Sequence, residues 1–553
     1  MPSLKSGLAS FCAFSLLLLQ LSSTEARRLP TNPQWVKLHA LRSQSTSDSL
    51  AKRQGATFPV FTFTQPLDHF VDTGFTFEQR YWLSDRHYKP GGPVIVFEAG
   101  EGPGDERMPI LDTGIVDILA NATNGLGIVL EHRGVRARAE FHHGFFEVQP
   151  FARTRALLFS RNGDMIAHTA RRMLSRWLNN EQAAADSANF IDNVTFPTIP
   201  GDLTAPGTPW IYYGGSYGGA RAAHMRVLYP DLVFGAISSS GVTHATLDDW
   251  RYFDIIRQYA PASCIAQVEK TIDEVDAFIT SPKAETRHAI KAVFGLQNIT
   301  YDPDFASLLS GPLGAWQENN WDPAVGSTAF ANFCDALGTP DNAKIHTAQG
   351  ITVSNATFNY AKYINNTYVR SCRPPATQDE CFGTITAKDQ YLATDLSQTW
   401  RTWDFQVCTQ WGFFMTPPPN PAIPRIISKL ITQEYASLIC KLAYPPGEHF
   451  QVPAEPNITA VNSLGGYNIA YDRLAIIDGE ADPWRGDTPH SPAAHPRPDT
   501  TLRPFKLIPG GVHHYDENGL ADHSLEPPQI QAIHQQEVEF VKAWLKDFKP
   551  PSK

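Results

Sequence analysis

The stretch IYYGGSYGGA, residues 211–220, places a β-branched and aromatic run directly before Ser216, with a pair of glycines on each side of the serine. Glycine weakens both strands and helices, so this density of glycine needs a reason. The spacing fits G-x-S-x-G, a tight turn between a strand and a helix that presents a nucleophilic serine. A glycine-rich loop without catalytic function is the alternative that this motif alone leaves open.

Two later segments contain the partners that such a serine requires. A serine hydroxyl needs a base to take its proton, and the base needs a carboxylate to orient it. In enzymes with this turn the carboxylate and the histidine follow the serine in that order, each after a late strand. The apolar run LAII leads to Asp478 and Asp482, and the run FKLIPGG leads to His513 and His514. This order predicts a serine hydrolase.

Short apolar runs bounded by glycine or turn residues are typical of buried parallel strands. They lie at residues 93–100, 127–134, 210–215, 234–241, 473–479 and 505–511. Between the fourth and fifth runs the chain is rich in amphipathic helical patterns and aromatic residues, and residues 535–548 read as a closing helix. The pattern predicts the α/β class, with an α/β-hydrolase core interrupted by a mostly helical cap domain.

We therefore expect five segments along the chain. They are a signal peptide at 1–26, a pro-segment or disordered N-terminus at 27–58, the first part of the core at 59–244, the helical cap at 245–445 and the second part of the core at 446–553.

The N-terminus has the pattern of a secretory signal. Lys5 precedes the apolar stretch FCAFSLLLLQL, and small residues follow it. The pair Lys52 and Arg53 marks a second processing site or an exposed dibasic pair. The apolar stretch is shorter than the roughly 20 residues that span a bilayer, so we expect a secreted, vacuolar or lysosomal protein without stable membrane insertion. The net charge of −10 favours no nucleic-acid partner.

The cysteines and asparagine sequons are those expected of a secreted protein, which passes through an oxidising compartment. Beyond the signal, an even set of cysteines lies within 245–445, which indicates three disulfides and allows fifteen connectivities. Proximity favours Cys264 with Cys334, Cys372 with Cys381, and Cys408 with Cys440. No C-x-x-C pair supports a zinc ribbon. Glycosylation sequons stand at Asn121, Asn193, Asn298, Asn355, Asn365 and Asn457.

Several blocks together resemble one family of serine peptidases. The blocks GGSYGGA, DGEADPW and GGVHHYD are similar to those of the family that contains lysosomal Pro-X carboxypeptidase, dipeptidyl peptidase II, thymus-specific serine protease and fungal prolyl endopeptidases. FTFTQPLDHF, AGEGPGD, LEHRG and DFQVCTQWGFF resemble further blocks, so the resemblance spans residues 60–548. It implies an α/β-hydrolase core with an inserted helical cap.

The resemblance also implies roles for individual residues. Ser216 matches the nucleophile, Asp482 the triad acid and His513 the base. Asp478 stands where the family has asparagine, which implies a turn residue, although the two aspartates could be reversed. His514 follows the base and is expected to support it.

Further positions around the serine have expected roles in catalysis or substrate binding. The backbone N–H of Tyr217 is expected to donate to the oxyanion, with a second donor from the loop at 100–102, the amide of Glu101 being our choice. Trp484 either lines a substrate pocket or belongs to the core. Gln410 stands where the family has glutamate and could alter a substrate subsite.

No histidine pair has the spacing of a metal site, so His132, His224 and the pair at 142–143 are expected to be core or surface residues and no metal or other cofactor is expected. The leading hypothesis is a secreted serine peptidase that cleaves peptides or proteins next to proline through an acyl-enzyme. A lipase or carboxylesterase of the same fold and a non-catalytic binding protein are the alternatives. Carboxypeptidase, dipeptidyl peptidase and prolyl endopeptidase activities all stay open, as does the oligomeric state.

Overall fold

The computed structural model describes residues 56–134, 177–385, 391, 400–447 and 450–550. The expected signal peptide, the dibasic pair at 52–53 and most of the expected pro-segment lie outside these residues. No helix in the described part of the chain is long and apolar enough to cross a membrane.

The core is an eight-stranded sheet with the strand order β1-β2-β4-β3-β5-β6-β9-β10. Its strands are β1 (Val60–Pro66), β2 (Thr76–Ser84), β3 (Val94–Glu98), β4 (Leu126–Leu130), β5 (Trp210–Gly215), β6 (Gly235–Ser239), β9 (Leu474–Gly479) and β10 (Phe505–Ile508). β2 pairs antiparallel with β1 and β4, and all other neighbours are parallel. The antiparallel pair β1 and β2 was not among the strands expected from apolar runs, because its burial alternates and its apolar residues are interrupted by polar ones.

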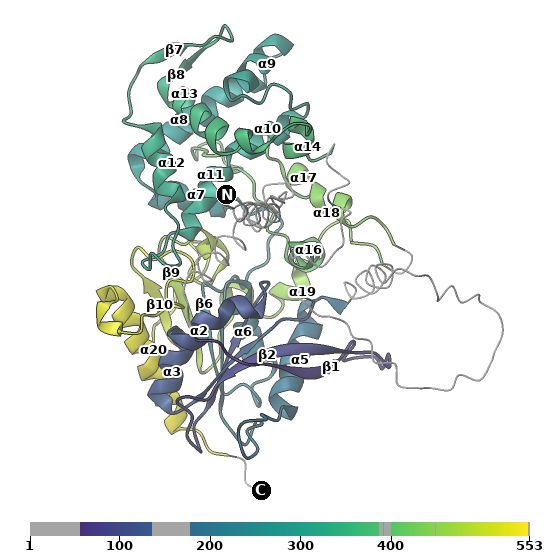
Figure 1. The fold of residues 1–553 in the computed structure, drawn as a ribbon, viewed down its shortest axis with the longest axis vertical. Helices are drawn as coiled ribbons and strands as arrows, with labels where there is room; N and C mark the ends of the chain where they lie inside the picture. The colour runs from purple at the N-terminus through teal and green to yellow at the C-terminus, as the bar shows by residue number, and fades with distance from the viewer. Residues whose placement is uncertain (1–55, 135–176, 386–390, 392–399, 448–449, 551–553) are drawn as a thin grey trace, which may run out of the picture.

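Helices cover both faces of this sheet, as expected for a doubly wound core (Figure 1). They are α2 (Met108–Asp112), α3 (Ile115–Thr123), α5 (Asn180–Asn193), α6 (Tyr217–Leu228) and α20 (Pro528–Lys546). Alternate residues of β3 point to opposite faces. Val94 and Val96 pack in the cluster that includes α5 and α6, whereas Ile95 and Phe97 pack in the cluster that includes α3 and α20. The closing helix α20 begins seven residues earlier than the pattern at 535–548 predicts.

A helical region lies between β6 and β9 and is gathered above the sheet in Figure 1. Its helices are α7 (Arg251–Tyr259), α8 (Ala262–Ile279), α9 (Ala284–Val293), α10 (Asp302–Leu309), α11 (Gly311–Gly314), α12 (Ala329–Leu337), α13 (Asn355–Thr367), α14 (Gln378–Phe382), α16 (Trp400–Gln406), α17 (Gln433–Ala436), α18 (Leu438–Ala443) and α19 (Ile458–Asn462), with a hairpin of β7 (Lys344–His346) and β8 (Thr352–Ser354). A separate apolar cluster forms its core. The expected α/β-hydrolase core with an inserted, mostly helical cap is confirmed.

Three disulfides cross-link this helical region. They join Cys264 to Cys334, Cys372 to Cys381 and Cys408 to Cys440, the pairs that proximity in the sequence favours. Because a disulfide stabilises mainly by restricting the unfolded chain, the cap carries covalent stabilisation that the described part of the sheet does not.

The sequons lie mostly at the surface. Asn121, Asn193, Asn298 and Asn457 are exposed, whereas Asn355 and Asn365 are half-buried. The side-chain amide of Asn355 donates to Asp341 at 2.8 Å, so a glycan on this nitrogen would leave one N–H for that hydrogen bond.

Candidate active site

The glycines around Ser216 are required by the close approach of other backbone atoms. β5 ends at Gly215 and α6 begins at Tyr217, with Ser216 between them at φ 56° and ψ −122°. A Cβ on Gly214 would lie 2.1 Å from the carbonyl oxygen of Gly218, and one on Gly219 would lie 2.6 Å from that of Ser239. Glycine is thus the residue that fits, and a positive φ at a non-glycine residue is backbone strain held by its surroundings.

Ser216, His513 and Asp482 lie in a hydrogen-bonded row. The Nε2 atom of His513 is 2.9 Å from the Ser216 hydroxyl, and its Nδ1 atom is 2.9 Å from Oδ2 of Asp482. All three side chains are buried. Asp482 follows β9 and its other oxygen, Oδ1, accepts the backbone N–H of Trp484 at 2.9 Å. That contact fixes the carboxylate while Oδ2 faces the imidazole.

Asp478 lies in a different contact group from Asp482. Its Oδ2 accepts the hydroxyl of Thr488 at 2.8 Å and lies 2.6 Å from Nδ1 of His490. Within the described structure, the aspartate in contact with His513 is Asp482.

His514 packs beside His513. Its ring centroid is 4.0 Å from that of His513, and its Nδ1 atom is 3.1 Å from Oε2 of Glu517. The backbone N–H of His514 donates to the hydroxyl of Ser240 at 3.2 Å. His514 therefore holds the loop that carries His513 and lies against its ring.

The loop after β3 lies against the first turn of α6. Gly100 has a φ of 68°, and a Cβ there would be 3.5 Å from the amide nitrogen of Gly218. Glu101, next in the chain, is half-buried. This brings the loop at 100–102 to the same helix terminus whose first residue is Tyr217.

The phenol ring of Tyr217 is buried under the cap. Its hydroxyl lies 2.9 Å from Nε2 of His132 and 2.8 Å from Oε1 of Gln406, and its ring centroid is 4.8 Å from that of Trp403. Burial raises the pKa of Tyr217, and the charges of Glu98 and Glu101 add to this effect while Arg221 opposes it. These contacts join the turn from β5 through Ser216 to α6, called the elbow from here on, to α16 of the cap.

His132 is a neutral core histidine, one of the two placements that the sequence leaves open, and its contact with Tyr217 was not anticipated. Burial, with Arg221 nearby, lowers the pKa of His132 to about 3. The LEHRG and DFQVCTQ blocks contain His132 and Gln406, so the resemblance pointed to the segments without giving these side chains a role.

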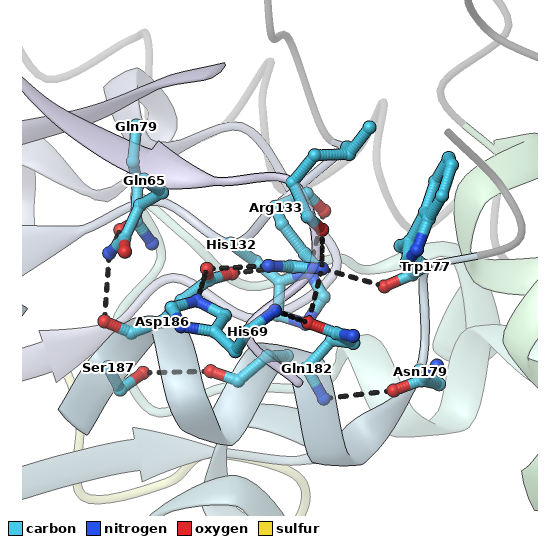
Figure 2. A network of polar contacts seen from close by, with 12 residues as sticks. Gln65, His69, Gln79, His132, Arg133, Trp177, Asn179, Gln182, Asp186 and Ser187 are labelled. Carbon is cyan, nitrogen blue, oxygen red and sulfur yellow. Dashed lines mark hydrogen bonds and ion pairs between the residues drawn. The ribbon is translucent and has the colours of Figure 1, made fainter. Parts of the chain in front are cut away.

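A polar network holds the end of β4 against α5, as Figure 2 shows. The Arg133 guanidinium donates to both oxygens of Asp186, at 2.5 and 2.6 Å, and His69 lies 2.7 Å from the same carboxylate. Arg133 also donates to the carbonyl oxygens of Leu67 and Trp177. The adjacent residue His132 is thereby fixed, and with it the contact to the elbow.

Trp484 is buried and packs within the core rather than lying open. Its indole N–H donates to Gln317 at 2.8 Å, and its ring centroid lies 5.2 Å from that of Tyr252 and 6.3 Å from that of His513. Gln410, in the helical turn Val407–Trp411, lies beside the start of α5. Its Oε1 atom accepts the backbone N–H of Asn180 and its Nε2 atom donates to Glu181, each at 2.8 Å. These described contacts join Gln410 to the core rather than to the serine.

Strand order, elbow and inserted cap together define an α/β-hydrolase. The family model for serine carboxypeptidase S28 matches residues 65–134 and 166–537. The chain therefore belongs to this family and is a serine-type peptidase. This placement argues against the lipase and the non-catalytic alternatives.

Curated relatives match over most of the chain. A probable extracellular serine carboxypeptidase of Arthroderma benhamiae is 36% identical over 96% of this chain and 74% of its own length. A serine protease of Bipolaris victoriae is 28% identical over 82% of this chain and 83% of its own length. Human lysosomal Pro-X carboxypeptidase is 25% identical over 94% of this chain and 92% of its own length.

Proposed function

We propose that this chain is a secreted peptidase that hydrolyses peptide bonds next to proline through an acyl-enzyme on Ser216. The observation that carries the proposal is His513, whose two ring nitrogens lie 2.9 Å from the serine hydroxyl and from the Asp482 carboxylate. A base in contact with both a nucleophile and an orienting carboxylate is the arrangement that activates serine in peptidases.

In this mechanism His513 moves one proton in each direction. Its Nε2 atom takes the proton of Ser216 as Oγ attacks the carbonyl carbon of the scissile bond, and it then gives that proton to the departing amine. Asp482 accepts the Nδ1–H bond, which keeps the lone pair on Nε2 and stabilises the imidazolium. Water attacks the acyl-enzyme with the same base, which releases the acid and restores the serine.

The oxyanion of each tetrahedral intermediate would form at the N-terminus of α6. The N–H of Tyr217 is the first donor in this proposal, and the loop at 100–102 supplies the second, with the amide of Glu101 our choice. The buried contacts of the Tyr217 ring with His132, Gln406 and Trp403 support this role, because they fix the residue whose amide must be aimed.

Proline specificity is supported by the names of relatives. One relative is named a Pro-X carboxypeptidase. Secretion is supported by the three disulfides, which persist in oxidising compartments, and by an extracellular relative.

Fluorophosphonate labelling tests the nucleophile. The wild-type protein should react with the probe at Ser216, and Ser216→Ala should neither react nor hydrolyse peptides, with residual turnover at least about 10⁴-fold lower. Circular dichroism of the variant checks that the fold is retained. A folded Ser216→Ala protein with near wild-type turnover would overturn the assignment.

Matched peptides test the substrate. Pro, Ala, Leu and Phe are compared on the acyl side of the scissile bond by kcat/KM, each in peptides with free and with blocked termini. Proline should be preferred, with alanine second, since an apolar pocket discriminates by only about 1–3 kcal/mol per methylene. A tenfold preference for Leu or Phe would reject proline specificity and leave the serine chemistry standing. Loss of cleavage on blocking one terminus would identify an exopeptidase acting at that end.

A further inference from the structure

His523, Glu526 and His534 form a cluster on the side of the core where α20 begins. His523 lies in the short turn of His523–Leu525, Glu526 follows that turn, and His534 lies in α20. Nδ1 of His523 is 2.8 Å from Oε1 of Glu526, and Nδ1 of His534 is 3.0 Å from Oε2 of the same carboxylate. One ligand atom from each residue lies within 4.8 Å of the other two.

One of the two ring contacts of His534 needs a proton or a metal ion between its atoms. Its Nε2 atom lies 2.9 Å from the carbonyl oxygen of Asp516, which can only accept, so Nε2 carries a proton. In a neutral imidazole the other nitrogen, Nδ1, is then an acceptor, yet it faces the Glu526 carboxylate. His534 is buried. Either a proton, on this ring or on the carboxyl of Glu526, or a metal ion must occupy the space between the two acceptors.

The surroundings favour the metal ion. Two imidazole nitrogens and one carboxylate form a ligand set that zinc takes in proteins, with a water molecule in the remaining position. A metal-binding histidine usually donates its other ring N–H to a carbonyl or carboxylate, as His534 does to Asp516. The Glu526 carboxylate is oriented by the N–H of Leu520 at 2.9 Å. The side chain of His523 is 45% exposed, which gives an ion access from solvent.

We propose that His523, Glu526 and His534 bind one Zn²⁺ ion, which joins the turn at 523–526 to α20. Asp516, which receives the N–H of His534, lies three residues after His513 in the chain. Its carboxylate accepts the hydroxyls of Tyr213 on β5 and Ser239 on β6, each at 2.6 Å. The ion is structural, because the row of Ser216, His513 and Asp482 is complete without it. The spacing H-x₂-E-x₇-H is not a common zinc motif, so the sequence alone did not indicate this site.

Metal content and thermal stability test the proposal. The full-length protein is dialysed against a chelator, then against buffer, and titrated with Zn²⁺ while bound zinc per chain and the thermal midpoint are measured. Wild type should bind about one equivalent and unfold at a higher temperature with zinc. His523→Ala should bind zinc at least about 10-fold more weakly and lose the shift, since the loss of a direct ligand should cost no less than the loss of an outer partner.

The matched control is His495→Ala, which removes another exposed histidine outside the cluster and should behave as wild type. Fluorophosphonate labelling of Ser216 in each sample shows that the proteins are folded, and circular dichroism gives the same control independently of catalysis. The proposal is overturned if wild type binds no zinc, or if folded His523→Ala binds it as tightly as wild type. Either result would assign the cluster to proton-mediated ion pairs.

Discussion

Asp482 and Asp478 are four residues apart, yet their contacts differ completely. Asp482 faces His513, whereas Asp478 accepts a hydrogen bond from Thr488 and contacts His490. We predict that Asp482→Asn lowers kcat by about 10⁴-fold, because the amide favours the wrong tautomer of the base. Asp478→Asn is the matched control and should keep activity within about tenfold. Comparable losses in both folded variants would argue against Asp482 as the orienting carboxylate.

His513 and His514 are adjacent in the chain but, like the two aspartates, have different contacts. His513 contacts the serine and the carboxylate, whereas His514 contacts Glu517 and the hydroxyl of Ser240. We predict that His513→Ala loses nearly all turnover, by at least about 10⁴-fold. His514→Ala should retain measurable turnover, with a loss that comes from a less firmly held loop. An inactive His514→Ala protein beside a nearly active His513→Ala protein would reverse the two roles. Steady-state kinetics on one peptide decides between them.

Among the structural elements, the cap depends on its disulfides more than the sheet does. All three disulfides lie between α8 and α18. We predict that mild reduction raises hydrogen exchange in α8, α12 and α13 before it does so in β3 and β5, because the cross-links restrict the unfolded cap chain. Exchange that rises equally in the sheet strands, or six free thiols in the purified protein, would contradict this.

The helix α16 carries a buried acid, Asp404, that the sequence did not single out. Asp404 is 1% exposed, and neither of its carboxylate oxygens has a hydrogen-bond partner among the described residues. Burial raises the pKa of Asp404 to about 8, although Arg401 acts in the opposite direction. The folded protein therefore holds this proton up to a pH at which the unfolded chain has lost it, since the ordinary value is near 4.

This difference makes stability depend on pH. The folded pKa is above the unfolded one, so Asp404 contributes stability that is fully present below about pH 4 and is lost as the pH rises through about 8. We predict that the free energy of unfolding falls by about 2 kcal/mol between pH 6 and pH 8 through this group. Asp404→Asn, which is neutral at every pH, should flatten that part of the curve. Urea denaturation at both pH values measures it, and equal slopes in the two proteins would exclude Asp404 as the cause.

At the scale of the whole molecule, buried histidines and buried acids have opposite effects on how the free energy of unfolding depends on pH. Burial lowers the pKa of His132 and His224 to about 3, so folding is disfavoured as the pH falls below their ordinary value near 6.5. Burial raises the pKa of Asp249 and Asp516 to about 6, which favours the fold in acid. Above about pH 7.5 both histidines are neutral in either state, so they no longer contribute to the slope there. The two sets of residues therefore change the free energy of unfolding in opposite directions between about pH 4 and pH 6.

The sequence by itself determined the features that depend on local geometry and order. Gly214 is dictated within the turn itself, where a Cβ would meet the carbonyl oxygen of Gly218, and the order of Ser216, Asp482 and His513 follows the order of the strands. Apolar runs marked the buried parallel strands because both faces of these strands are covered. They did not mark β1 and β2, whose burial alternates.

Only the tertiary structure decided the contacts between residues far apart in the chain. Tyr217 meets His132 and Gln406 across 85 and 189 residues, and Arg133 meets Asp186 across 53. The cluster of His523, Glu526 and His534 likewise depends on how a turn packs against α20. No local pattern encodes such pairs, because each depends on packing between elements whose relative placement is a property of the whole fold. The burial that shifts the pKa of Asp404 arises in the same way.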